Sequence, residues 1–311
     1  MLNVLLDYFF KVTTVVPTPP ASTAFLRQVL LVVKPKVDVA EVISEVTTEA
    51  GLTALTENLN GRDLLNGGLN KIFVLPKATL AISADLNASL NQYFTVIIST
   101  DFDAAEIADL DLGTFKGVTC VHEDDETFLE AQAAIENRCA FVHIPGADTR
   151  SSACFAFAKM LSNQIGFKNQ QYISVPWASG PSYVLADYVD FFDKRISFVI
   201  SDTQFSHRLG FFVCGGKAIV EPYIRKQIEI DMQSRALSYV SLNQPQYTVV
   251  QAALVQDELQ KVIDSFIARD QISFGSIVIS LVNENFVANA NIVISEPTGF
   301  WRFNGILTQQ N

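Results

Sequence analysis

The stretch YFTVIISTDFDAAEIADL, residues 93–110, gives the clearest indication of the fold class of this chain. Its first eight residues form a largely apolar run, which is typical of a strand buried on both faces of a sheet. The following residues, DAAEIADL, predict a short helix that begins among acidic side chains. A doubly buried strand followed by a helix is the repeating unit of a mainly parallel sheet.

The same order of strand and helix recurs along residues 71–201. Predicted strands lie at 71–76, 93–100, 118–122, 139–145, 172–177 and 196–201. Predicted helices lie between them at 83–92, 103–110, 126–137, 151–163 and 182–194. Ahead of this series there is another apolar run at 25–33, a predicted helix at 37–55 and a predicted Gly/Asn-rich loop at 59–70. This part of the sequence predicts an α/β fold built as a mainly parallel βαβ layer sandwich.

The pattern changes after residue 211. A long helix is predicted from residue 221, with Pro222 in its first turn. Its apolar residues repeat on one face, at Ile224, Ile228, Met232, Ala236 and Val240. A second helix carries Leu259, Val262, Ile263, Phe266 and Ile267. Residues 276–297 predict two strands joined by a tight turn, and FWRFNGIL at 300–307 alternates like a third strand. The fold class is therefore α/β followed by α+β, with a smaller helix-and-hairpin module and strand-like terminal arms.

The composition describes a globular, acidic chain. Hydrophobic residues make up 49% of the 311 residues and charged residues 18%, which excludes an intrinsically disordered chain. The net charge of −11 argues against a nucleic-acid-binding protein, because neutralising phosphates requires an excess of Lys and Arg. Residues 1–210 hold 15 Lys and Arg against 24 Asp and Glu, whereas residues 211–311 hold 7 against 9, so the front part carries most of the charge.

Neither a secretory signal nor a membrane span is predicted. No apolar run approaches about 18 residues, and Asp7 interrupts the apolar start of the chain, which has no basic region. The four cysteines (Cys120, Cys139, Cys154 and Cys214) form no C-x-x-C pair and lie in apolar segments. Buried free thiols in a reducing compartment are their expected state.

Asp101 and Asp103 follow the strand at 93–100, where ligands bind in open parallel sheets. Their spacing weakly resembles the nucleophile and acid pair of haloacid-dehalogenase-like phosphatases, in which two carboxylates act beside a bound Mg²⁺. Ala105 stands where that family prefers Thr or Val, and no matching downstream lysine is evident. A helix N-cap with first-turn acids is the favoured interpretation. A Mg²⁺-dependent α/β phosphohydrolase-like enzyme is retained as the alternative.

No other group of residues predicts catalysis. The run from His122 to Glu126 cannot turn consecutive side chains toward one ion, so it is better explained as an acidic helix start. His143 and His207 have no Ser or Cys nucleophile at a recognisable elbow, and the glycine pairs form no phosphate-binding loop. We therefore predict that the chain is not an enzyme, with no catalytic, cofactor-binding or metal-binding residues and no cofactor.

Several features spread along the chain carry a resemblance to a known family. They are the proline-punctuated N-terminal strand, NGGLNKIFVLP (66–76), DKRISFVISDTQFSHRLGFFVCGG (193–216), and the C-terminal order of long helix, second helix, hairpin and last strand. In this order of elements the chain resembles the contractile-tail sheath proteins of bacteriophages, of the compact kind. It departs from them in having room for only one decorating domain. The arginine pair that often opens the long helix is also missing, and Arg225 and Lys226 stand one turn in.

The resemblance implies four parts: an N-terminal arm (1–22), an α/β outer domain (23–210), an inner α+β module (211–299) and a C-terminal arm (300–311). It implies a structural subunit that forms a helical homo-oligomer around the tail tube, exchanges terminal β-strands with its neighbours, and contracts to drive the tube into the host. The implied partners are further copies of the chain and the tail tube, baseplate and tail terminator proteins, with no nucleic acid and no membrane insertion. The implied location is the virion tail, assembled in the host cytoplasm.

The same resemblance assigns apolar inter-subunit anchors to the two arms: Phe10, Val12, Val15, Phe300, Trp301, Phe303, Ile306 and Leu307. Main-chain hydrogen bonds would join each arm to a neighbour's sheet, and alternate side chains would set its register. The residues alone leave a second possibility open, in which FWRFNGIL folds back on the hairpin of its own chain. A tail-tube or tail-terminator subunit would also assemble through β-edges, but the long βαβ series fits such a subunit poorly.

Overall fold

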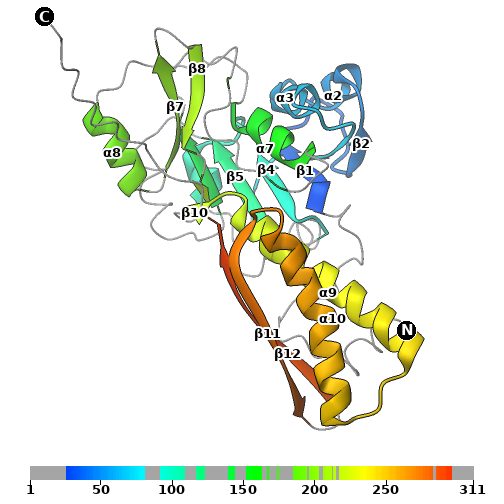
Figure 1. Cartoon of the computed structure of the whole chain (residues 1–311). Helices are drawn as coiled ribbons and strands as arrows, with labels where there is room; N and C mark the ends of the chain where they lie inside the picture. The colour runs from blue at the N-terminus through cyan, green and yellow to red at the C-terminus, as the bar shows by residue number, and fades with distance from the viewer. Residues whose placement is uncertain are drawn as a thin grey trace, which may run out of the picture.

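The computed structural model describes residues 26–80, 92–108, 117–122, 139–143, 152–162, 167, 174, 185–194, 196–202, 206–211, 213–214, 217–282 and 285–295. An eight-stranded sheet forms the body of the protein, and a long hairpin extends from it beside two long helices (Figure 1). The protein is thus a mixed α/β structure in which a parallel-containing sheet is followed by a separate antiparallel hairpin, as predicted.

The large sheet has the strand order β2-β3-β1-β4-β5-β6-β7-β8. Its strands are β1 (Val29–Val33), β2 (Ser44–Val46), β3 (Ile72–Pro76), β4 (Thr95–Ile98), β5 (Val118–His122), β6 (Cys139–His143), β7 (Ser197–Asp202) and β8 (Ser206–Phe211). The six central strands are parallel, and β2 and β8 pair antiparallel at the two edges. Every residue of β4 is buried, which confirms that the apolar run at 93–100 contains a central strand.

The helices described around the sheet are α2 (Glu49–Leu55), α3 (Asn60–Asn66), α5 (Ala104–Ala108), α7 (Ser152–Ser162) and α8 (Leu185–Asp193). α5, α7 and α8 lie inside segments predicted to be helical. The predicted helices at 83–92 and 126–137 lie outside the described residues, except for residue 92.

Two local predictions are wrong. The first half of the predicted helix at 37–55 contains β2 instead, because its β-branched residues favour extended backbone and β3 offers a partner. The helix begins only after Thr48, whose hydroxyl accepts a hydrogen bond from the Gly51 amide. The predicted loop at 59–70 contains α3. A Cβ atom on Gly67, at the end of α3, would lie 2.3 Å from the Cβ of Ala158 on α7, so this glycine permits close helix packing.

The C-terminal module has the predicted order of elements. A short antiparallel pair, β9 (Val213–Cys214) and β10 (Lys217–Ala218), leads into α9 (Glu221–Asn243) and α10 (Val249–Ile267). The hairpin follows as β11 (Ile272–Val282) and β12 (Asn285–Ile294). A Cβ atom on Gly275 of β11 would lie 2.4 Å from Cγ2 of Ile263, so the glycine lets α10 lie directly against the hairpin.

The start of α9 joins this module to the large sheet. Tyr223 is fully buried, and its hydroxyl is hydrogen-bonded to the hydroxyl of Thr95 at 2.7 Å, at the amino end of β4. The Tyr223 ring also packs edge-on against Phe94, with ring centroids 5.2 Å apart, and against Phe167 at 5.0 Å. The hairpin module is therefore attached at the amino ends of the parallel strands.

α9 is buried on more than its predicted face. Ile224 and Ile228 are buried as predicted, but Tyr223, Lys226 and Ile230 are buried as well. Burial on more than one face follows from the position of the first turns of α9, which contact the sheet as well as α10. Lys226 forms an ion pair with Glu229 at 2.9 Å within the same helix.

Cys154 on α7 is buried, as predicted. The side chains of Cys120, Cys139 and Cys214 lie outside what the structure describes. Among the described helices, none combines the length and the apolar character needed to cross a membrane.

Candidate functional site

The residues predicted to anchor the arms lie outside the described part of the chain. Phe10, Val12 and Val15 fall in residues 1–25, and Phe300, Trp301, Phe303, Ile306 and Leu307 fall in residues 296–311. Within the described residues, two other surfaces are candidate sites. These are the carboxyl edge of the parallel sheet and the β11–β12 hairpin.

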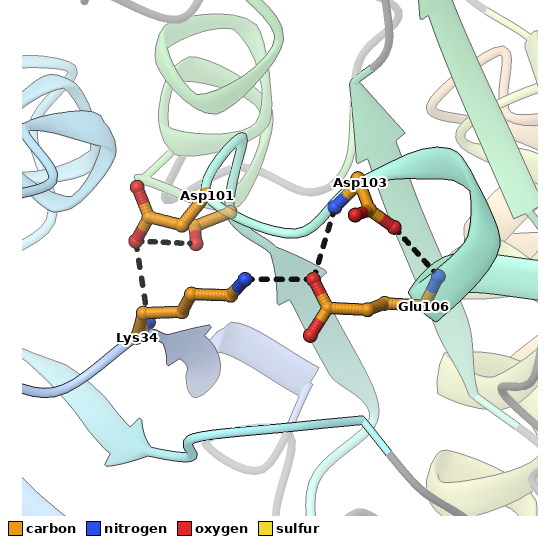
Figure 2. Close-up of polar contacts among 5 residues, drawn as sticks. Lys34, Asp101, Asp103 and Glu106 are labelled. Carbon is orange, nitrogen blue, oxygen red and sulfur yellow. Dashed lines mark hydrogen bonds and ion pairs between the residues drawn. The ribbon is translucent and has the colours of Figure 1, made fainter.

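At the carboxyl edge, Asp101 links three segments of the chain, and its contact with Lys34 is drawn in Figure 2. Its Oδ2 accepts hydrogen bonds from the Lys34 amide at 3.2 Å and from the Ser99 hydroxyl at 3.1 Å. Its Oδ1 accepts a hydrogen bond from the side-chain amide of Asn58 at 2.7 Å. Because Lys34 follows β1 and Asn58 precedes α3, the carboxylate holds the neighbouring loops together.

Asp103 caps α5. Its Oδ1 accepts a hydrogen bond from the Glu106 amide at 2.9 Å, and Glu106 Oε2 accepts one from the Asp103 amide at 3.2 Å. This reciprocal pair is a capping box, so the predicted N-cap is confirmed for Asp103. Lys34 Nζ completes the cluster through an ion pair of 2.7 Å with Glu106. Figure 2 shows the Asp101 and Asp103 carboxylates turned toward different partners.

The carboxyl edge is therefore a structural cluster whose polar groups bond to one another. Within the described residues, no three His, Cys, Asp or Glu side chains are placed to hold a metal ion. His122 and His143 end the neighbouring strands β5 and β6, and His207 lies in β8.

The hairpin differs from the carboxyl edge in having uncharged strands. β11 and β12 contain no Asp, Glu, Lys or Arg. One face packs against α10 and buries Ile277, Phe286 and Ala288. The opposite face leaves Phe274 53% exposed and Val278 56% exposed. An uncharged, apolar ribbon of this length exposed to water is typical of an interaction surface.

Sequence reasoning found the hairpin but did not identify it as a site. The signal was present, because an uncharged stretch running from Ile272 to Val282 stands out in a chain with 18% charged residues. What the sequence could not show is that this ribbon forms a separate two-stranded sheet with α10 on one face.

Known proteins resemble this chain in fold but not in sequence. No protein-family model and no curated protein matches the sequence. Among solved structures, the chain is similar to a chain of the anti-feeding prophage (AFP) baseplate, with a TM-score of 0.69 and 10% identity over 95% of this chain and 97% of that chain. It is also similar to the AFP helical sheath in its contracted state, with a TM-score of 0.62 and 12% identity over 96% of this chain and 99% of that chain.

A third similar structure is the sheath tail protein of Listeria innocua, with a TM-score of 0.51 and 9% identity over 90% of this chain and 100% of that chain. At these identities the likeness concerns the fold. The chain has the fold of contractile-tail sheath proteins over almost its full length, and the resemblance found in the sequence is confirmed at that level.

Proposed function

We propose that this chain is a structural subunit of a contractile tail sheath. The observation that carries the proposal is the likeness to the AFP helical sheath protein over 96% of this chain and 99% of that chain. A match of this extent includes both the large sheet and the helix-and-hairpin module. In this proposal, copies of the chain assemble into a helical tube around a tail tube and contract to drive that tube into the host.

The join between subunits is proposed to be strand exchange through the two arms. The hairpin supports this idea, because it forms a separate two-stranded sheet with no charged side chain to repel an incoming strand. Main-chain hydrogen bonds would hold the incoming strand. The apolar residues of FWRFNGIL would contribute roughly 1.5–3 kcal/mol each on full burial.

The arrangement of the parts is also proposed. The acidic front part, 23–210, would form a layered βαβ outer domain facing solvent, and the near-neutral module, 211–299, would line the inner surface against the tail tube. The net charge supports this order, because most of it lies in the first 210 residues and a highly charged layer is best placed in water. Baseplate and tail terminator proteins would bind the two ends of the tube, placing the chain in the virion tail after assembly in the host cytoplasm.

We further propose that the chain is not an enzyme. Asp101 and Asp103 support this view, since their carboxylates accept hydrogen bonds from neighbouring loops and from the first turn of α5. Incubating the purified chain with a generic phosphate ester and Mg²⁺ should give no hydrolysis above that of an Asp101→Asn variant.

Electron microscopy of the purified full-length chain, alone and with its tail-tube protein, tests the assembly. We expect rings or helical tubes. A chain lacking residues 299–311 should remain folded by circular dichroism and sediment as a monomer, because it lacks the C-terminal arm. A destabilised truncated chain that still assembles would contradict the proposal, as would a full-length chain that stays monomeric at high concentration by light scattering.

A further inference from the structure

The end of the helix-and-hairpin module farthest from the large sheet contains an uncharged turn. Residues 236–256, which include the last turns of α9 and the first turns of α10, contain no charged side chain. Figure 1 shows the connection between the two helices at the end of the module away from the large sheet. The remaining parts of both helices hold charged residues: Glu221, Arg225, Lys226, Glu229, Asp231 and Arg235 on α9, and Asp257, Glu258, Lys261 and Asp264 on α10.

Four large apolar side chains are exposed at this turn. Leu242 on α9 is 79% exposed, Val249 on α10 is 77% exposed, and Val250 and Leu254 of α10 are exposed as well. Val250 and Leu254 are four residues apart and therefore lie on one side of α10. Single exposed apolar side chains are ordinary, but four of them in an uncharged stretch are typical of an interaction surface. These four residues are called the turn patch.

The hairpin face opposite α10 has the same character. Its apolar members Phe274, Val278 and Val282 on β11 and Val293 on β12 are each about half exposed. Val293 lies opposite Phe274 in register, and small serines separate the large residues along β11. Neither strand contains a charged residue. This surface is called the outer face.

In one copy, the turn patch and the outer face lie on opposite sides of the hairpin. Tyr247, between α9 and α10, packs against Phe286 with ring centroids 5.8 Å apart. Phe286 is buried and pairs with Leu281 on the face against which α10 packs. The turn therefore lies on the covered side of the hairpin, and only the turn patch of another copy can reach the outer face.

We propose that the turn patch of one copy packs against the outer face of the hairpin of the next copy. The inference rests on the proposed function, because it assumes that copies of the chain assemble. The contact is made by side chains on the faces of the two elements and is separate from any pairing of strands.

The absence of charge on both surfaces favours this partner. Burying a charged group against an apolar surface costs free energy unless the group is paired. Residues 1–210 hold 15 Lys and Arg and 24 Asp and Glu, so a contact between this part and the turn patch would take unpaired charges out of water. The outer face has no charge to desolvate, and its valines and Phe274 gain from burial.

The symmetry of the contact also agrees with the proposed assembly. The two surfaces differ, so each copy offers its turn patch to one neighbour and its outer face to another. Such a heterologous contact continues from copy to copy and gives rings or helical filaments, whereas a contact between two turn patches would end at a dimer. A helical sheath requires a contact of the first kind.

A charge-swap experiment tests the contact in the full-length chain. Val250→Glu places a negative charge in the turn patch, and Val278→Lys places a positive charge on the outer face. Each substitution alone should raise the concentration needed for assembly by roughly tenfold or more, because a charge would be buried without a partner. The chain that carries both should recover assembly, since every contact then holds one charge of each sign. Light scattering measures assembly. Melting followed by circular dichroism should show that all variants are folded, because both positions are exposed.

Val42→Glu is the matched control, because Val42 is also an exposed valine but precedes β2 of the large sheet. It should assemble like the parent chain. Equal weakening by Val42→Glu, normal assembly of Val250→Glu, or a double variant that assembles no better than the single ones would overturn the inference. Normal self-assembly of Val250→Glu with loss of binding to the tail-tube protein would also overturn it, since the turn patch would then face the tube. A parent chain that never assembles would overturn the proposed function itself.

Crosslinking provides an independent test of the symmetry. A full-length chain with both Val250→Cys and Val278→Cys is assembled, treated with a short bismaleimide and run on a denaturing gel. The parent chain gives the background for the native cysteines. We expect a ladder of dimers, trimers and longer products, because a heterologous contact links each copy to two others. Products that stop at the dimer, or a ladder no stronger than that of the parent in assembled particles, would overturn the inference.

Discussion

The carboxyl edge of the sheet gathers four charged side chains, Lys34, Asp101, Asp103 and Glu106, whereas β11 and β12 contain none. Composition alone would place a binding or catalytic site at the first region and a structural element at the second. The hydrogen bonds support the opposite assignment, with a structural role for the carboxyl edge and a binding role for the hairpin. Each charged group at the carboxyl edge bonds to a neighbouring loop, helix turn or side chain. On β12, Ala288 and Ala290 lie opposite Ile279 and Ile277, whose amides donate to glutamine side chains of α10 and not to β12. In an antiparallel pair the facing alanines then also point their backbone groups outward.

Unused hydrogen-bonding capacity, and not charge, is therefore the property on which the hairpin is proposed as the interaction surface. A cluster of charges satisfied within the fold has little left to offer a ligand. A row of backbone groups on a strand edge can pair with any extended segment of suitable register.

The largest effect is expected from Ala290→Pro. Proline removes the outward amide of β12 and places a ring where an incoming strand would pair, but it leaves the bonds to β11 in place. We expect loss of assembly by sedimentation with a melting temperature close to that of the parent chain.

Asn289→Pro is the control for this substitution. The Asn289 residue lies in the row that bonds to β11, opposite Val278, so proline there should disrupt the hairpin itself and lower the melting temperature. Normal tubes formed by Ala290→Pro would argue against a functional β12 edge.

A smaller effect is expected from Gly275→Ala in β11. The new Cβ would meet Cγ2 of Ile263 at 2.4 Å, and forcing α10 away from the hairpin should cost about 1–3 kcal/mol. Gly51→Ala in α2 is the matched control, because its nearest neighbours lie at 3.5 and 3.6 Å and alanine favours a helix. Urea unfolding should therefore show loss of stability for the first variant and none for the second.

At the carboxyl edge, Asp101→Asn should destabilise the fold by about 1–2 kcal/mol, because an amide cannot accept all three hydrogen bonds that the carboxylate receives. Assembly should persist wherever the chain is folded, since this cluster lies at the opposite end of the parallel strands from the hairpin module. Loss of assembly without loss of stability would show that the carboxyl edge takes part in a subunit contact.

The smallest effect is expected from Asp231→Asn on α9. This substitution should stabilise the fold at neutral pH, whereas Gly275→Ala and Asp101→Asn should destabilise it. Burial raises the pKa of the Asp231 carboxyl above its usual value of 3.8, and Arg269 offsets part of that rise. Because the folded-state pKa exceeds the unfolded one, the ionised carboxylate destabilises the fold at neutral pH, and this cost disappears as the pH falls below the unfolded value.

Asp231→Asn should therefore raise the melting temperature at pH 7. The gain in the free energy of unfolding should be well under about 1 kcal/mol, because the group is only half-buried. The difference from the parent chain should vanish near pH 3. A difference that grows toward acid pH would contradict the assignment.

The elements with strong periodicity could be predicted from the sequence. The apolar run at 93–100 predicted a strand that is buried on both faces of the sheet. The one-face repeat through Ile224, Ile228 and Met232 predicted α9. The order of helix, helix and hairpin, and with it the resemblance to sheath proteins, followed from the same local patterns. Asp103 was recognisable as an N-cap because Glu106 stands three residues later.

The features that depend on partners distant in sequence could not be predicted in this way. Residues 44–46 became a strand because β3 paired with them, and Tyr223 was buried because the fold places it beside Thr95. Gln260 on α10 reaches the Gly275 carbonyl because a glycine at this position lets α10 come close to β11. Local periodicity carries no information about such contacts, because their free energy depends on groups that meet only when the chain has folded.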